Sequence, residues 1–261
     1  MSEFLTAHEA TLRSGLFFGL LLALLLVERW RPRRRQHVRW RHFFGNLGIG
    51  VGNSILLRLL VPGGLVVVAL SGQHTGLLAR IDLPLWMEFI GCLILLDLSL
   101  YWQHRLFHRL PFFWAFHSAH HGDRTLNVSS ALRFHPGEAL LSFVIKAATI
   151  WLLGAPVAAV IAFEVLLNGA AMFNHTNWSL GRFDAVLQKL IVTPDMHRLH
   201  HSRQEAEAQH NFGFFLSVWD RLFASYQAEP QQDHGDIELG LADMPDDGWR
   251  ATLKQPLKLL R

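Results

Sequence analysis

HRLFHRLPFFWAFHSAHH, residues His104 to His121, ends an apolar segment and contains five histidines. A second cluster, His197-Arg198-Leu199-His200-His201, lies closer to the C-terminal end. Histidines grouped this tightly indicate a shared chemical task rather than isolated surface positions. We therefore expect the remaining segments to form a scaffold that brings the two clusters together beside a membrane.

The composition limits the classes of protein that the chain can belong to. Of its 261 residues, 51% are hydrophobic, and its mean hydropathy is positive, which is unusual for a soluble domain. Cys92 is the single cysteine and lies in an apolar run, which excludes a disulfide framework and a cysteine-based metal site. Any metal must therefore be held by nitrogen and oxygen ligands, and half of the sixteen histidines fall in the two clusters.

Positive charge is concentrated at one place near the N-terminus. Seven arginines lie between Arg29 and Arg41, directly after the apolar segment Thr11 to Val27. This order is typical of a cytoplasmic membrane flank, and a cleavable signal peptide would show the reverse order. Because the basic residues do not spread along a face, the net charge of +3 does not indicate a nucleic-acid partner. We predict a retained helix whose C-terminal end is cytoplasmic.

Four further apolar segments follow the arginines. The first should kink or break at Pro62-Gly63-Gly64, and only Gly154-Ala155 separates the last two, which predicts a helical hairpin. Counting spans from the arginines places all histidine clusters on the cytoplasmic side. The predicted fold class is all-α: an integral membrane bundle of about four to five apolar helices with a cytoplasmic histidine-rich di-metal cap. The segments are Phe44 to Leu70, Leu85 to His108, Ala139 to Leu153 and Pro156 to Phe173.

The segments and the clusters divide the chain into three expected regions. Residues 1–84 carry the N-terminal membrane helices with the Arg-rich cytoplasmic flank, residues 85–226 form a histidine-box catalytic domain, and residues 227–261 form a polar C-terminal tail. A short amphipathic helix is also expected from Phe183 to Ile191, between the hairpin and the second cluster.

Helical spacing predicts how the histidines are presented. His104 and His108 are i and i+4, so their side chains lie one above the other as a bidentate metal clip. His117 and His120 are i and i+3, whereas His121 points about 100° away from His120, so this box can contact two ions. Together, eight imidazoles can supply four ligands to each of two ions, and imidazole suits Fe, Zn, Cu and Ni alike. The HxxHH spacing recurs at His197, His200 and His201.

Polar residues inside the apolar segments form two lines. Asp97 shares a helix face with His104 and His108, and an ionisable residue in a membrane span normally points inward to a partner. Asp97 is therefore a candidate to orient a ligating histidine, with a bond to another helix as the alternative. In the second arm of the hairpin, Glu164 and Asn168 form a second inward-pointing line that ends at His175.

The motifs HRLFH, HSAHH and HRLHH resemble the three histidine boxes of the fatty acid hydroxylase/sterol desaturase superfamily of membrane-bound di-iron oxygenases. Flanking segments resemble others usual in that family: LRFHPGE at 132–138, FNHTN at 173–177 and NFGFFLSVWDRLF at 211–223. The resemblance covers about residues 85–226. It implies a histidine-rich di-iron centre at the cytoplasmic face and O₂-dependent hydroxylation or desaturation of a lipid.

The resemblance also implies the site residues. His175 is added to the box histidines because family members often have an extra ligand in this region, and His135, Asp97 and Asp195 are possible metal ligands or outer partners of one. No catalytic residue separate from the metal site and no other cofactor site is expected. Two Fe ions are the expected cofactor, and Zn can replace them in purified protein. The implied metal ligands are His104, His108, His117, His120, His121, His175, His197, His200 and His201.

The expected partners are a lipid substrate from the bilayer and a separate electron donor, ferredoxin-like or cytochrome b5-like with its reductase, because no fused redox domain is visible. Arg109 follows the first box, where the alkylglycerol monooxygenase-like branch tends to have an acidic residue, and this disfavours that branch. Sterols, fatty acyl chains, carotenoids, ether lipids and sphingolipid-like bases all fit as substrates. The lack of an organelle signal and the compact loops favour a bacterial inner membrane.

Two other functions compete with the oxygenase. One is a non-redox, zinc-dependent lipid enzyme, since imidazoles also suit zinc. The other is a histidine-rich metal transporter, which should place its ligands at the bilayer midplane, commonly in repeated halves. The histidines lie instead at helix ends, and the sequence has no internal repeat.

Overall fold

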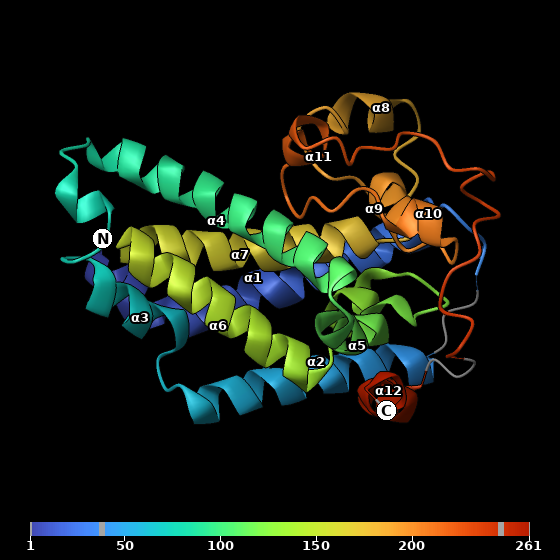
Figure 1. Ribbon diagram of the computed structural model, residues 1–261, viewed down its shortest axis with the longest axis horizontal. Coiled ribbons are helices and arrows are strands. Elements are labelled where there is room, and N and C mark those ends of the chain that lie inside the picture. The colour runs from blue at the N-terminus through green and yellow to red at the C-terminus, as the bar shows by residue number, and fades with distance from the viewer. Residues whose placement is uncertain (1, 37–39, 245–247, 261) are drawn as a thin grey trace.

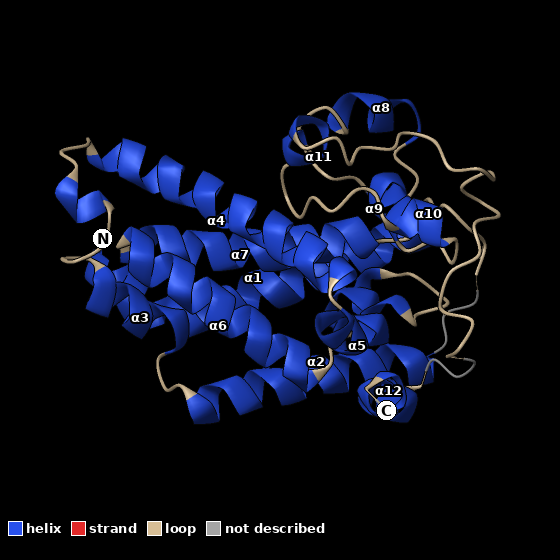
Figure 2. Ribbon diagram, in the orientation of Figure 1, coloured by secondary structure: helices blue, strands red, loops and turns tan. Residues whose placement is uncertain are grey.

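The computed structural model describes residues 2–36, 40–244 and 248–260. Residues 37–39 of the expected Arg-rich flank lie outside the described residues, as do residues 1, 245–247 and 261, and no side chain is described for residues 2–10 and 12. The described chain is built from helices and loops and contains no β-strand (Figure 2). This confirms the prediction of an all-α fold.

Five long helices run side by side along the long axis of the molecule (Figure 1). Among the residues that the structure describes, α2, α4, α6 and α7 are long and apolar enough to cross a membrane, and only 11% to 39% of their most apolar windows is buried inside the protein. The exposed remainder is apolar surface that a lipid bilayer would cover. The predicted bundle is therefore confirmed, and the chain is an integral membrane protein. The helices are α1 (Ser2–Trp30), α2 (Trp40–Leu60), α4 (Leu85–Arg109), α6 (Pro136–Leu153) and α7 (Val157–His175).

The predicted hairpin joins α6 to α7. Gly154 ends α6 with a φ of 67°, a left-handed conformation that glycine adopts without the steric penalty of a Cβ. The amide of Gly76 lies against this turn so closely that a Cβ on Gly76 would sit 2.1 Å from the Gly154 nitrogen. Glycine at both positions lets the loop before α4 pack against the hairpin at the end of the bundle away from the histidines.

The predicted break at Pro62-Gly63 is also present. Helix α2 ends at Leu60, and a short helix α3 (Gly64–Gly72) follows after Gly63, which has a φ of 82°. Leu65 and Ala69 of α3 join a buried apolar cluster with Leu96 of α4 and other residues of α6 and α7. The second apolar segment thus forms one long helix and one short helix rather than one kinked span.

The elements that carry the histidines gather at one end of the bundle (Figure 1). Helix α4 reaches this end, Pro111 starts α5 as its first residue, and α7 returns to the same end. Both clusters therefore lie on one side of the bundle, as counting the spans predicted. The shorter elements at this end are α5 (Pro111–His121), η2 (Val128–Leu132), η3 (Gly181–Phe183), α8 (Asp184–Leu187), α9 (Pro194–His200), α10 (Glu205–Ala208), α11 (Val218–Leu222) and α12 (Trp249–Leu259); η1 (Leu78–Arg80) lies at the other end.

Two segments differ from simple expectations. The helix expected from Phe183 to Ile191 is shorter, since α8 ends at Leu187. Ile191 instead pairs with Leu216 in an antiparallel bridge, because the neighbouring Val192 amide donates to the Phe215 carbonyl. The region expected as a polar tail carries α12, which packs against α5 and α2.

Candidate metal centre

Nine histidines converge where α4, α5, α7 and α9 meet, and all nine are buried. Their ring nitrogens form two groups, and within each group the ligand atoms lie within 4.8 Å of one another. The five-histidine group consists of His104, His108, His117, His121 and His200. The four-histidine group consists of His120, His175, His197 and His201.

Both HxxHH boxes divide between the groups in the same way. His117 and His121 join the five-histidine group, whereas His120 joins the other. The box thus contributes to both groups, as its spacing predicted, and the residue that turns to the other group is His120 rather than His121. On a helix, i and i+4 lie about 40° apart and i and i+3 about 60° apart in the opposite sense, so the first and last histidines of a box face the same side. The second box follows the same rule, with His200 crossing to the five-histidine group.

One pair in each group holds two nitrogen lone pairs face to face. In the five-histidine group, His104 and His200 donate their Nδ1–H to the carbonyls of Phe212 and His210. Each neutral ring then has only an acceptor at Nε2, yet these two Nε2 atoms lie 3.0 Å apart. Two acceptors cannot hydrogen-bond to each other, whereas a cation between them would satisfy both.

The four-histidine group repeats this arrangement. His120 and His175 donate their Nδ1–H to the carbonyls of Arg133 and Ala171, and their Nε2 atoms are 3.0 Å apart. His117 adds a further buried acceptor, because Glu138 takes its Nδ1–H and its Nε2 has no hydrogen-bond partner among the described residues, although buried polar atoms normally have one. His108, His197 and His201 also turn Nε2 toward a neighbouring ring of their group, at 3.1 to 3.2 Å. This donor set fits an imidazole-bound metal ion.

Burial favours the neutral form of several of these rings. Burial lowers the pKa of His200 to about 3, and burial together with the neighbouring His201 and His108 rings holds the pKa of His121 well below its usual range. Burial also lowers the pKa of His197, with His175 as the nearest contributing ring. Neutral imidazole is the form that binds a metal.

Residues outside the boxes fix the orientation of the rings. The His117 Nδ1–H donates to the Glu138 carboxylate at 2.6 Å, the carboxylate–histidine arrangement that orients metal ligands. Asp220 accepts from the amides of Phe212 and Gly213, each at 2.7 Å, and thereby positions the carbonyl that holds His104. Sequence reasoning missed both acids. Glu138 could have been found, because it begins an apolar helix within the LRFHPGE segment.

The three further candidates lie outside both groups. His135 caps α6 by accepting from the Gly137 amide at 2.9 Å. Asp97 accepts from the Phe215 and Leu216 amides and from the Trp219 indole, so its hydrogen bonds hold a loop rather than an imidazole. Asp195 is ion-paired with Arg33 at 2.9 Å.

A cavity of about 240 Å³ opens onto both groups. Histidines of both groups, His104 and His175 among them, form one wall. Apolar side chains from α4, α7 and the segments beside them form much of the remainder, including Phe107, Leu167 and Phe214. An apolar cavity of this kind can hold part of a lipid next to the metal centre.

Comparisons with known proteins agree with this geometry. The chain is 30% identical over 173 residues to an ornithine lipid hydroxylase of Rhizobium tropici, covering 66% of this chain and 51% of the relative. It is 28% identical over 222 residues to the alkylglycerol monooxygenase of Danio rerio, covering 82% and 46%. It is 30% identical over 155 residues to the human alkylglycerol monooxygenase, covering 56% and 31%. The chain thus spans about half or less of these relatives.

Relatives named alkylglycerol monooxygenase match the chain at 28% to 30% identity, and the expectation drawn from Arg109 stays a prediction. No solved structure matches the chain. The fatty acid hydroxylase family model matches residues 89–225, more than half of the chain, and these residues include every histidine of both groups. On this evidence, the chain belongs to the fatty acid hydroxylase family.

Proposed function

We propose that this protein is an O₂-dependent di-iron hydroxylase or desaturase that acts on a membrane lipid and receives electrons from a separate carrier. The observation that carries the proposal is the pair of buried histidine groups that share a wall of a partly apolar cavity. The relatives named as hydroxylating ornithine lipids and oxidising alkylglycerols support a lipid substrate.

In this proposal each histidine group holds one iron ion. When bound, two irons supply the redox chemistry that activates O₂ for attack on an unactivated C–H bond, which acid–base side chains cannot break. The carbonyls of Phe212, His210, Arg133 and Ala171 keep the Nε2 atoms pointing inward, and Glu138 does the same for His117. The apolar cavity excludes water and positions the lipid.

The proposed boundaries and orientation follow the expectations from the sequence. The family match at 89–225 supports a catalytic region at 85–226, between the N-terminal helices of 1–84 and the tail of 227–261. We propose that the histidine end faces the cytoplasm, in a bacterial inner membrane. Arg33, from the Arg-rich flank, lies at this end in its ion pair with Asp195, which supports that orientation because such flanks are normally cytoplasmic.

The proposal is tested with purified protein, a ferredoxin or cytochrome b5 with its reductase, bilayer lipids and ¹⁸O₂. A hydroxylase transfers labelled oxygen to the lipid, whereas a desaturase forms a double bond and retains no label. Either product must require both reductant and O₂. Iron-loaded protein that consumes no O₂ with any lipid class would contradict the proposal.

A further inference from the structure

A charged site lies within the bundle, away from the histidines. Arg13 of α1 and Glu164 of α7 form an ion pair at 2.9 Å, with 32% and 18% of their side chains exposed. Lys146 of α6 has both residues as electrostatic neighbours, but it makes no hydrogen bond or ion pair with a side chain that the structure describes. Lys146 is thus a cation that no described side chain contacts directly through a hydrogen bond or ion pair.

The position of Lys146 makes a charge without a direct partner expensive. It lies near the middle of α6, a helix apolar enough to cross a membrane, and a lysine at that depth normally has a partner or a function. Lys146 lies about two turns or more from either end of α6, so its side chain is far from the bilayer surface. A lysine near a helix end, in contrast, can extend its ammonium group to that surface.

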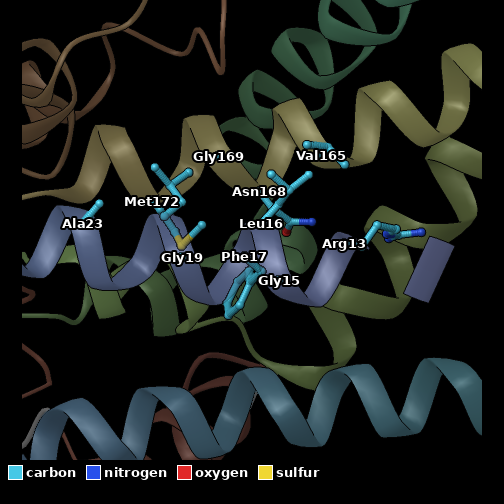
Figure 3. Close-up of a pocket in the computed structure, with 11 residues that line it drawn as sticks. Arg13, Gly15, Leu16, Phe17, Gly19, Ala23, Val165, Asn168, Gly169 and Met172 are labelled. Carbon is cyan, nitrogen blue, oxygen red and sulfur yellow. The ribbon is translucent and has the colours of Figure 1, made fainter. Parts of the chain in front are cut away.

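Three cavities meet at this site. Lys146 and Asn168 line the cavity of about 240 Å³ that reaches the histidines. Arg13, Glu164 and Asn168 line a second cavity of about 830 Å³ between α1, α2 and α7. Arg13 and Asn168 also line a groove of about 450 Å³ between α1 and α7 (Figure 3).

The groove is accessible from the lipid side of the bundle. Leu16, on its rim, is 57% exposed, and the glycines Gly15, Gly19 and Gly169 line it without side chains (Figure 3). A lipid chain could therefore reach the charged residues laterally, from the bilayer.

The cavity that Lys146 lines leads to the metal centre. Asn168 is seven residues before His175 on α7, so their backbones are about 10 Å apart along the helix axis. Leu167 and Ala171 line the cavity from α7 and Leu100 lines it from the facing helix, together with the polar residues Gln103 and Ser142. One end of the cavity therefore carries a lysine, and the other end carries the histidines.

We propose that Lys146, with Asn168, forms a binding site for the acidic end group, a carboxylate or a phosphate, of an amphiphilic substrate whose apolar chain extends to the histidines. This inference rests on the proposed lipid oxidation, and it adds the class of substrate and its orientation. Oxidation would then fall on the chain, remote from the acidic group.

The test measures binding in nanodiscs of zwitterionic lipid. The probes are hexadecanoate, hexadecyl phosphate and the uncharged hexadecanol, which share one chain. Of the two acids, the one with the higher affinity should bind to the wild type at least about tenfold more tightly than the alcohol does, as expected for one charge-assisted contact. Lys146→Met should abolish this preference, whereas Lys146→Arg should retain most of it. Lys189→Met, at an exposed lysine outside the cavities, is the matched control and should match the wild type.

Equal affinity of the wild type for acids and alcohol, or an unchanged preference in Lys146→Met, would overturn the inference. The acid that binds more tightly identifies the end group as a carboxylate or a phosphate. Iron content and O₂-dependent oxidation are measured on the same preparations. If the protein binds iron and oxidises lipid but does not prefer acids, only the acid site is overturned. If the protein prefers acids through Lys146 but cannot bind iron, the acid site is supported and the proposed oxygenase is contradicted.

Discussion

The two histidine groups are built from the same HxxHH boxes, but different surroundings hold them. In the five-histidine group, a carboxylate, Glu138, orients His117. In the four-histidine group, the described partners outside the group are main-chain carbonyls, those of Arg133 and Ala171. The Ala171 carbonyl belongs to the same helix as His175, so one position depends on α7 alone. The comparison teaches that equal sequence motifs can yield sites that differ in charge and in tolerance of mutation.

The largest effect is expected from His175→Ala, because His175 lies outside the three boxes yet faces His120 and His197 at 3.0 and 3.1 Å. Loss of this ring should remove the iron of the four-histidine group and reduce lipid oxidation by more than the about 10–100-fold typical of an altered outer partner. His135→Ala, outside both groups, is the control and should retain iron. Full iron and full activity in His175→Ala would show that the box histidines suffice.

A smaller effect is expected from Glu138→Gln, which keeps the shape of the side chain but removes its charge. The five-histidine group should lose roughly 10–100-fold in metal affinity, measured by competition with a chelator, while the four-histidine group changes little. Glu238→Gln, in an exposed ion pair with Arg203, is the control. An equal loss of metal affinity in both groups would contradict the inference that Glu138 supports only the five-histidine group.

Asp97→Asn tests an indirect contribution to the metal centre, because Asp97 anchors the loop whose Phe212 carbonyl holds His104. The amide can accept but cannot satisfy all three donors, so thermal unfolding should show a loss of about 1–3 kcal/mol. Iron content at low temperature should stay near that of the wild type. Asp82→Asn, at an exposed position, should have no effect on stability. Complete iron loss in folded Asp97→Asn protein would give Asp97 a direct role at the metal.

The smallest effect is expected from Asp195→Asn. Its partner Arg33 is 24% exposed, and a partly exposed ion pair of this kind contributes at most about 1 kcal/mol. Iron content and oxidation should therefore stay near those of the wild type, measured at low ionic strength where the pair matters most. Loss of iron would instead link Asp195 to the nearby His197 in the four-histidine group.

The sequence predicts the bundle well because its signals are local. Apolar runs of membrane length predict the long helices, and Pro62-Gly63 and Gly154 mark the turns because few residues other than glycine adopt a positive φ. The helix expected from Phe183 to Ile191 is too long because its last residues pair with Phe215 and Leu216, contacts that no local pattern reveals.

In the site, too, features set by local sequence could be predicted, and features set by contacts between distant segments could not. All nine histidines could be predicted, since the boxes have helical spacing and His175 ends a polar line on its own helix. Their distribution between two groups could not, because it depends on how α5 and α9 face each other. Glu138 was overlooked in favour of His135 because their roles are set by contacts with Phe116 and His117 from another helix.

Metal content of detergent-purified protein, measured by elemental mass spectrometry, tests the central claim most directly. The wild type is compared with His120→Ala and His200→Ala, one variant from each group. The account predicts about two irons per chain in the wild type, one for each group, and a loss of iron in both variants. Freshly prepared, folded protein without bound metal, or variants with the iron content of the wild type, would contradict it, and zinc that persists after iron-supplemented growth would favour a non-redox enzyme.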